Sequence, residues 1–264
     1  MPRISVSQEP ELGQEFTRAA SEPSLAVVIP VHNEIKALPR LIRHLNSLDP
    51  PPDEVIIVDG DSDDGTTDYA RAAGLHVVCC EKGRPNQINR GVAETTCSLV
   101  CVLHADTFLP DDGVATIRRV FAEPSVALAG FISVMSGPDK VRWASSFHNL
   151  VKTWYAPAVF RPWLFATRGL RLLFGDHAMS FRRSDFLKVG GLDCGMPVME
   201  EGDLCLKMCR LGRIKLINRI VLSSDRRVAE WGELKANLIY VKVAVLWGLG
   251  VRGERLSRYY PDVR

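Results

Sequence analysis

The sequence lacks the segments that carry proteins into or across membranes. No stretch approaches the roughly 18 uncharged apolar residues of a spanning helix, and the nearest candidate, residues 238–251, is shorter and contains Lys242. Residues 1–24 are polar without an apolar core, so we expect a flexible tail rather than a signal peptide. The sequence therefore predicts a cytoplasmic protein, with any membrane contact limited to the periphery.

The sequence also lacks an excess of charge of one sign and any Cys-x-x-Cys pair. Lys and Arg number 33 against 31 Asp and Glu, which gives no reason to expect a nucleic-acid partner. The 7 cysteines do not show the spacing of a zinc site. Several fall inside apolar runs, and we expect them to be reduced core residues.

What the sequence does contain, from Leu25 onward, is an alternation of short β-branched runs and longer helical patterns. Strands are predicted over 25–31, 54–60, 75–80 and 98–106, and helices over 35–48, 65–73 and 86–96. Continuous apolar strands separated by helices indicate a parallel sheet covered on both faces. We expect one α/β domain over residues 25–264, a size that can bury a substantial core.

Polar residues gather where these strands end, at His32 to Glu34, at Asp59 to Asp64 and at His104 to Asp106. The carboxyl ends of parallel strands meet at one edge of a sheet, which is where nucleotides bind in such folds. A carboxylate there, such as Asp59, can accept hydrogen bonds from ribose hydroxyls or a base N–H. Asp64 has a second interpretation, since it could simply cap the helix that starts near Thr66.

The second half of the chain differs in composition. Residues 140–175 contain no acidic residue, and their Lys and Arg interleave with Trp, Tyr and Phe. We expect this segment to bind an acceptor or to lie on a membrane surface, and a packed insertion with outward Arg is the alternative. A strand over 177–183 and an amphipathic helix over 200–213 are predicted to follow.

Six motifs, in this order, resemble family 2 glycosyltransferases of the GT-A fold: VVIPVHNE, VIIVDGDSDDGT, GRPNQINRG, VLHADT, GDHAMSFRRSDFLKVGG and PVMEEGDLCLKMCRLG. The similarity is strongest to the subgroup labelled "transferase 2, radical SAM/selenodomain-associated". It implies a mostly parallel central sheet with helices on both faces. The implied parts are a Rossmann-like nucleotide-sugar half (25–130), an acceptor half (131–222) and a C-terminal helical region (223–264).

The resemblance also implies where the donor binds. It assigns the nucleotide pocket to Pro30, Asn33, Glu34, Asp59 and Ser62, and donor contacts to Arg84, Gln87 and Asn89. A helix N-terminus and a guanidinium together suit a diphosphate, because both present N–H donors to the anion. A solvated Arg84 beside a capping Asn is the simpler alternative.

The segment His104-Ala105-Asp106 stands where many relatives carry Asp-x-Asp. By resemblance, Asp106 is the retained ligand of Mg²⁺ or Mn²⁺. One carboxylate suffices when the sugar diphosphate completes the coordination shell. His104 could ligate Mn²⁺, bond the nucleotide, or only pack at the strand end.

The acidic cluster Glu200, Glu201 and Asp203 opens the later helix. In similar enzymes this position reads Glu-Asp, and the Asp is the general base that takes the acceptor proton. The alignment puts Glu201 there, one methylene longer than Asp, with Asp203 as the rival base. All three could instead merely favour a helix N-terminus.

Two further segments complete the implied site. Asp176 would line the acceptor side, and Arg226 with Arg227 would lie near the diphosphate or the acceptor. We expect this arginine pair on a strand, where at most one of the two points inward. Val228 follows the pair where relatives have Trp, which weakens the match.

The function that these residues predict is metal-assisted, inverting transfer of a sugar from a UDP- or GDP-linked donor to an acceptor hydroxyl, lipid-linked acceptors included. Residues 140–175 or 238–251 are candidate membrane contacts, and the C-terminal segment could instead pack on its own domain or form a homodimer. Nucleotidyl transfer is an alternative, although it usually needs a glycine-rich loop that the first strand lacks here. A non-catalytic nucleotide-sugar-binding or membrane-associated scaffold is the other.

Overall fold

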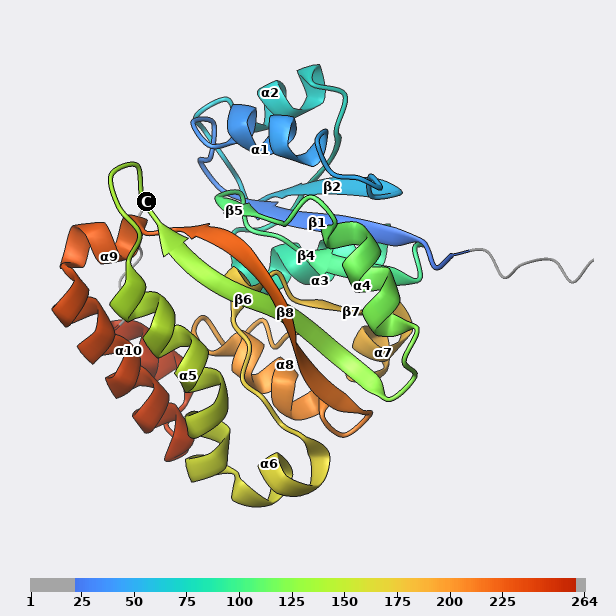
Figure 1. Ribbon diagram of the computed structural model, residues 1–264. Coiled ribbons are helices and arrows are strands. Elements are labelled where there is room, and N and C mark those ends of the chain that lie inside the picture. The colour runs from blue at the N-terminus through green and yellow to red at the C-terminus, as the bar shows by residue number, and fades with distance from the viewer. Residues whose placement is uncertain (1–21, 260–264) are drawn as a thin grey trace, which may run out of the picture.

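The computed structural model describes residues 22–259, which form one twisted sheet with helices on both faces (Figure 1). The eight strands of these residues have the order β3-β2-β1-β4-β7-β6-β8-β5. They are β1 (Leu25–Val31), β2 (Glu54–Asp59), β3 (His76–Cys79), β4 (Leu99–Val102), β5 (Thr107–Phe108), β6 (Val126–Ser136), β7 (Ser180–Arg182) and β8 (Arg213–Ser224). The predicted tail lies outside the described residues except for 22–24.

The helices are α1 (Leu38–Leu45), α2 (Thr66–Ala72), α3 (Arg84–Glu94), α4 (Gly113–Phe121), α5 (Trp143–Phe160), α6 (Pro162–Arg168), α7 (Arg183–Lys188), α8 (Glu200–Met208), α9 (Arg226–Trp231), α10 (Glu233–Gly248) and α11 (Gly253–Leu256), with short 3₁₀ turns η1 (Gly175–His177) and η2 (Ser257–Tyr259). In Figure 1, α5, α9 and α10 gather beside β6 and β8, away from the β1–β3 edge. None of the helices within residues 22–259 has both the length and the apolar composition to cross a bilayer.

Strands β1 to β4 are parallel; β1, β2 and β4 are largely buried on both faces, whereas β3 is a partly exposed edge strand. Val28 and its alternating neighbours pack against Ile88 of α3, and Val27 and its neighbours pack against Leu41 of α1 and Ile117 of α4. Each buried side chain of this kind contributes about 1.5–3 kcal/mol relative to exposure. Coverage of both faces is therefore the reason why these strands read as continuous apolar runs.

Helix α3 lies close against the sheet and is tied to the strand ends. At Gly91 a Cβ atom would lie only 2.4 Å from Val28 Cγ1, so only glycine permits this approach. One turn earlier, Gln87 Nε2 donates to the carbonyls of Val31 (2.6 Å) and Val58 (2.8 Å). These contacts fix the N-terminus of α3 at the carboxyl ends of β1 and β2.

The short strand β7 joins the two parts of the sheet, because it pairs antiparallel with both β4 and β6. Beyond it, β6 and β8 form a long parallel pair. β5 follows β4 after a four-residue loop and pairs antiparallel with the end of β8, with Thr107 opposite Ser223. This pairing brings the loop after β4 next to the residues that follow β8.

The predicted mostly parallel α/β architecture is confirmed, and two element boundaries are corrected. The helix predicted over 200–213 ends at Met208, because the chain turns into β8 at Gly212, where a Cβ would lie 2.4 Å from the Ser125 carbonyl oxygen. The strand predicted over 177–183 is shorter, since η1 takes up the residues before Ala178.

Candidate active site

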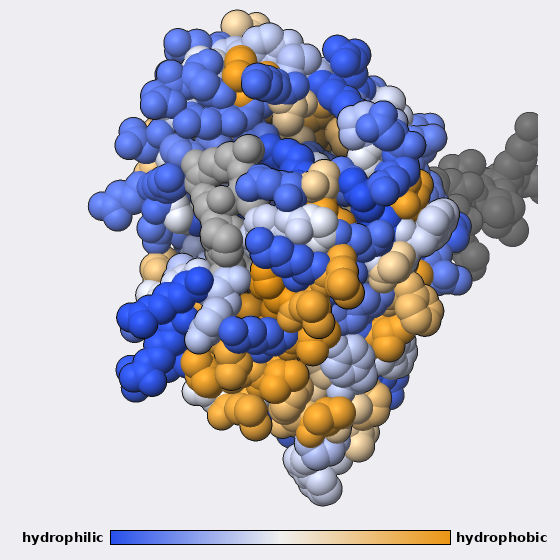
Figure 2. Space-filling view, turned by 90° about the vertical axis from the view of Figure 1, so that its left-hand side faces the viewer, coloured by the Kyte–Doolittle hydropathy of each residue, from blue (hydrophilic) through white to orange (hydrophobic). Residues whose placement is uncertain are grey.

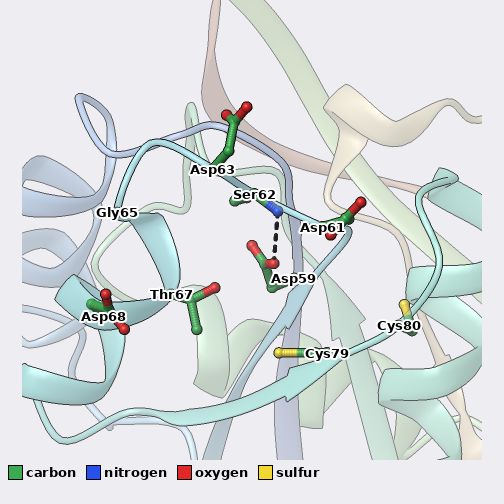
Figure 3. A pocket seen from close by; sticks show the side chains of 9 residues that line it. All are labelled: Asp59, Asp61, Ser62, Asp63, Gly65, Thr67, Asp68, Cys79 and Cys80. Atoms are coloured by element: carbon green, nitrogen blue, oxygen red, sulfur yellow. Dashed lines mark hydrogen bonds between the residues drawn. The ribbon is translucent and has the colours of Figure 1, made fainter.

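A groove of about 520 Å³ lies at the carboxyl ends of β2 and β3 (Figure 3). Asp59, only 3% exposed, ends β2 in this groove, and its Oδ2 accepts a hydrogen bond from the Ser62 N–H at 3.0 Å. Its Oδ1 is buried and has no hydrogen-bond partner among the described residues. A buried carboxylate oxygen in this state indicates a donor from outside the chain, such as a ribose hydroxyl or a base N–H.

The loops after β1 and β2 hold each other in place beside this groove. Ser62 Oγ accepts from the Asn33 N–H at 2.9 Å, and Asn33 Oδ1 accepts from the Asp63 N–H at 3.0 Å. Asp64 Oδ1 accepts from the Thr66 N–H at 3.0 Å. The side chains of Asn33 and Asp64 are thus engaged in loop structure, and the N-cap residue of α2 is Gly65 rather than Asp64.

A second cavity, also about 520 Å³, lies between the ends of β1 and β4 on one side and α5, α8 and α10 on the other. It is lined by many of the predicted site residues: Pro30, Glu34, Arg84, Gln87, His104, Asp106, Asp176, Glu201, Arg226 and Arg227. Residues far apart in the sequence therefore meet around one space.

Arg226 bridges two of these carboxylates. Its Nη2 lies 2.7 Å from Asp106 Oδ2 and 2.9 Å from Glu34 Oε1. Burial lowers the pKa of Arg226, but its bonds and charge interactions with Glu34 and Asp106 outweigh this and raise it. Burial raises the pKa of Glu34, while Arg226 opposes the shift.

The expected strand placement of Arg226 and Arg227 is wrong, because β8 ends at Ser224 and the pair opens helix α9. Asp225 precedes the helix; it is buried and accepts from Arg142 Nε at 2.6 Å. On a helix, adjacent side chains are not forced to opposite faces as on a strand. Both arginines accordingly line the cavity.

Two neighbouring carboxyls at the start of α8 face one guanidinium. Arg84 Nη1, at the N-terminus of α3, lies 3.2 Å from Glu200 Oε1 and 3.4 Å from Glu201 Oε1. Glu200 is 1% exposed and Glu201 5%. Burial, and then the charge of Glu201, raise the pKa of Glu200. Glu200 is therefore held neutral over a wider pH range than usual, so the pair carries little more than one negative charge.

Gly175 of η1 lies where the loop between β4 and β5, which contains His104 and Asp106, approaches the start of α8. A Cβ at this position would lie 2.3 Å from His104 Cε1 and 3.1 Å from Glu201 Oε1. The absence of a side chain thus lets both groups approach the same backbone atom. His104 is half-buried with its Nε2 atom fully buried, and burial, reinforced by Arg84, lowers its pKa, so its imidazole is neutral.

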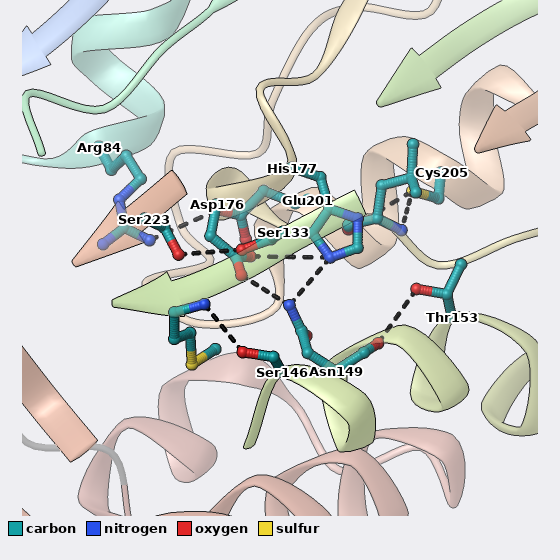
Figure 4. Close-up of polar contacts among 12 residues, drawn as sticks. Arg84, Ser133, Ser146, Asn149, Thr153, Asp176, His177, Glu201, Cys205 and Ser223 are labelled. Carbon is teal, nitrogen blue, oxygen red and sulfur yellow. Dashed lines mark hydrogen bonds and ion pairs between the residues drawn. The ribbon is translucent and has the colours of Figure 1, made fainter. Parts of the chain in front are cut away.

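On the opposite side of η1, polar groups from α5 enter the cavity (Figure 4). Asn149 Nδ2 donates to Asp176 Oδ2 at 2.6 Å and lies 3.0 Å from His177 Nε2. Burial raises the pKa of Asp176, but the charges of His177 and Lys152 outweigh this and lower it. An ionised Asp176 held in a fixed position could accept a hydrogen bond from an acceptor hydroxyl.

Lys152 was not among the predicted site residues. It is 8% exposed, lines the cavity, and its Nζ lies 3.8 Å from the centroid of the Phe174 ring. Burial lowers its pKa to about 8, against the charges of Asp176 and Glu201. A signal was present in the sequence: Ser145, Asn149 and Lys152 recur at helical spacing, on the face opposite to Trp143, Phe147 and Trp154.

Besides Asn33, two predicted residues line neither the groove nor the cavity. Asn89 Nδ2 donates to the Leu192 carbonyl, and its Oδ1 accepts from the Leu192 N–H, both at 2.9 Å. Asp203 pairs with Lys207 at 2.8 Å, one turn along α8. Asn89 therefore anchors a loop, and Asp203 is not placed to act as a base on a ligand in this cavity.

Asp106 and His104 are the residues that fit a divalent cation. Within residues 22–259, no group of three or more His, Cys, Asp or Glu side chains could hold a metal ion by itself. A cation held by these two residues would therefore need further oxygen ligands from water or from a bound molecule. His104 Nε2 is buried and has no hydrogen-bond partner within this part of the chain. A neutral imidazole and a carboxylate on one cavity suit a cation shared with the donor, Mn²⁺ in particular.

The model of the family described as "Glycosyl transferase family 2" matches residues 26–190, which include the ends of β1, β2 and β4 and the η1 turn. The chain belongs to glycosyl transferase family 2. The "Pre-mycofactocin glycosyltransferase" of Mycobacterium tuberculosis is 27% identical to it over 233 residues, 83% of this chain and 47% of that protein. The "Undecaprenyl-phosphate 4-deoxy-4-formamido-L-arabinose transferase" of Sodalis glossinidius is 32% identical over 110 residues, 38% of this chain and 34% of that protein. The chain thus spans about half the length or less of these curated relatives.

Solved structures of glycosyltransferases share the fold of this family 2 member. Glucosyl-3-phosphoglycerate synthase from Mycobacterium tuberculosis, in complex with Mn²⁺, UDP and glucosyl-3-phosphoglycerate, has a TM-score of 0.62 at 21% identity and covers 95% of this chain and 88% of its own. The mannosyltransferase PcManGT from Pyrobaculum calidifontis, in complex with GDP-Man and Mn²⁺, has a TM-score of 0.63 at 18% identity over 93% of this chain and 67% of its own. The predicted GT-A fold is confirmed by these likenesses.

Proposed function

We propose that this protein transfers a glycosyl group from a nucleoside diphosphate sugar to an acceptor hydroxyl, with inversion and with the help of a divalent cation. The observation that carries the proposal is that Glu201, buried and paired with Arg84, lines the same cavity as Asp106. Family membership and relatives solved with UDP or GDP-Man and Mn²⁺ favour a UDP- or GDP-linked donor. The finer likeness to the radical SAM/selenodomain-associated subgroup stays a prediction.

In this proposal the nucleoside lies at Asp59 and the diphosphate lies between Arg84 and Arg226, whose guanidiniums bind phosphate oxygens. A cation held by Asp106 and His104 would neutralise charge on the departing diphosphate. Glu201 takes the proton from the acceptor hydroxyl, which Asp176 and Asn149 orient. Because one relative is named for an undecaprenyl-phosphate substrate, a lipid-linked acceptor belongs to the proposal.

The test measures nucleoside diphosphate release from UDP-glucose and GDP-mannose with Mn²⁺, together with nucleotide affinity. We expect Glu201→Gln to lower turnover by about 100-fold or more while nucleotide affinity stays within a few-fold of the wild type. Asp106→Asn should remove the Mn²⁺ dependence of UDP or GDP binding in a thermal-shift assay. The matched control is Asp203→Asn, which removes a carboxylate from the same helix but outside the cavity.

Three outcomes would contradict the proposal. If Asp203→Asn abolishes turnover and Glu201→Gln does not, the base is assigned to the wrong residue. If the wild type binds donors but turns over none of them with any acceptor, the scaffold alternative stands. Release of pyrophosphate from a nucleoside triphosphate would instead support nucleotidyl transfer.

A further inference from the structure

Helix α5 is amphipathic in the opposite sense to an ordinary surface helix. Its buried face carries polar side chains: Ser145, Ser146, Asn149, Lys152 and Thr153. Its outer face carries Trp143 (70% exposed), Phe147 (66%) and Trp154 (43%), with half-buried Leu150, Val151 and Ala158 between them. These outer residues recur at helical spacing, so they form one continuous apolar stripe.

Helix α10 packs beside α5 and carries a second apolar stripe. Leu234, Leu238, Val241, Val245 and Leu249 recur at intervals of three and four residues and are 37–77% exposed. The two helices are closely apposed at their C-terminal ends, where a Cβ at Gly248 would lie 2.3 Å from the Phe160 ring. Both stripes point away from the cavity that Asn149 and Tyr240 line on the inner side.

The two stripes, together with Trp163 of α6 (76% exposed), form a surface that we call the α5–α10 face. Nine of the fifteen large hydrophobic side chains that are exposed within residues 22–259 belong to α5, α6 and α10, and a tenth, Leu249, directly follows α10. Figure 2 shows hydrophobic residues gathered across the lower half of this side of the molecule. Such a contiguous apolar surface marks an interaction site rather than a surface made for water.

The charges around this face are almost all positive. No acidic residue occurs from Lys140 to Gly175, and Arg168 on α6 is exposed. On α10 and beyond it, exposed Lys235, Lys242, Arg252 and Arg255 outnumber the acidic Glu233 and Glu254. Three of the five tryptophans of the chain lie exposed on this face. Tryptophan beside an apolar stripe with a cationic border is the composition of helices that lie in the interface of an anionic bilayer.

We propose that the α5–α10 face docks on a phospholipid bilayer that contains anionic headgroups. The apolar stripes enter the acyl boundary, and the surrounding Lys and Arg contact lipid phosphates. The charge pattern argues against a second copy of the chain as the occupant, because a two-fold interface would place one cationic border against another. This proposal does not depend on the proposed function, since it concerns the outer side of the two helices.

The test measures co-sedimentation of the protein with vesicles of phosphatidylcholine and phosphatidylglycerol, compared with vesicles of phosphatidylcholine alone. We expect the wild type to bind the anionic vesicles, more weakly as salt rises, with a blue shift of its tryptophan fluorescence. The triple variant Trp143→Ser/Phe147→Ser/Leu238→Ser should lose at least about tenfold of this binding, because three apolar side chains no longer leave water on docking.

The matched control is Leu187→Ser/Ile220→Ser, which removes exposed apolar side chains (48% and 53%) from α7 and β8, away from this face. It should bind vesicles like the wild type. Far-UV circular dichroism and thermal unfolding, measured in all variants, verify that each is folded and are expected to match the wild type.

Two results would overturn the proposal: failure of the wild type to bind anionic vesicles, or equal losses in the control and the triple variant. Sedimentation velocity addresses the rival occupant. A wild-type dimer that the triple variant converts to monomer, with vesicle binding unchanged, would show that the face pairs with a second copy instead.

Discussion

The guanidinium of Arg226 lies 2.7 Å from Oδ2 of Asp106, the residue that we propose as a ligand of a divalent cation. The same guanidinium is 2.9 Å from Glu34. In this state one arginine neutralises two carboxylates that would otherwise repel each other. A cation bound at this oxygen of Asp106 would therefore compete with Arg226, and its binding would leave the guanidinium to contact phosphate.

Replacing Arg226 should consequently strengthen metal binding in the absence of nucleotide. We expect Arg226→Gln to bind Mn²⁺ at least about tenfold more tightly than the wild type, because Glu34 and Asp106 lose their common counter-charge. Titration calorimetry of the nucleotide-free protein measures this. Arg226→Gln/Asp106→Asn should lose the gain, and weaker Mn²⁺ binding by Arg226→Gln than by the wild type would refute the competition.

Gly175→Ala should damage the site with little change elsewhere. The added Cβ would meet His104 at 2.3 Å and Glu201 at 3.1 Å, so one or both side chains must move. We expect a loss of about 1–3 kcal/mol in the free energy of unfolding and a fall in turnover of about 100-fold or more. Gly195→Ala is the matched control, since its nearest contact is a side-chain oxygen of Asp193 at 3.3 Å. Urea unfolding and donor turnover in both variants decide the matter.

Lys152→Met should stabilise the protein at neutral pH. Burial lowers the pKa of Lys152 from 10.5 to about 8, so the folded state at pH 7 holds a charge that the unfolded chain solvates better. The expected gain is at most about 3 kcal/mol below pH 8. It shrinks as pH rises toward 10.5, because the folded wild type gives up its proton first and gains stability over this range. Urea unfolding at pH 7 and pH 10 measures the difference in the free energy of unfolding between Lys152→Met and the wild type. A difference that grows with pH would contradict this assignment.

Glu200→Gln tests the neutral carboxyl beside Glu201. The pKa of Glu200 is raised above its ordinary 4.5, so between that value and the raised pKa the folded state binds a proton that the unfolded state has released. Wild-type stability should fall as pH rises through this window, whereas Glu200→Gln has no such group to lose. The variant should therefore match the wild type near pH 4.5 and exceed it at pH 8. Thermal unfolding across this range is the measurement, and a parallel pH dependence in both proteins would reject a raised pKa.

The nucleotide side of the fold could be predicted because its signals are local. Strands such as β1 are buried on both faces and read as continuous apolar runs, and the polar residues that end them reach the same sheet edge. The predicted strand ends and the family motifs therefore sufficed to place Asp59 at the end of β2 and to bring Arg84 and Asp106 to one cavity.

The acceptor side depends on contacts that no local pattern contains. The placement of Arg226 failed because β8 ends beside Asp225, which Arg142 holds from a position 83 residues earlier. Asn89 was assigned to the donor, yet it is bound to Leu192 through both atoms of its amide. Lys152 was recognised only as part of a basic segment, since its burial depends on distant parts of the chain: its Nζ lies 3.8 Å from the ring centroid of Phe174 and 5.6 Å from that of Tyr240 on α10.

The reversed polarity of α5 separates two sets of positions along one helix. The residues of α5 that face the cavity and the residues that are exposed on its outer side are two separate sets on opposite faces of the helix. Trp143, Phe147 and Trp154 can thus be replaced by polar residues to obtain a more soluble sample for crystallisation. These substitutions leave the residues of α5 that line the cavity unchanged.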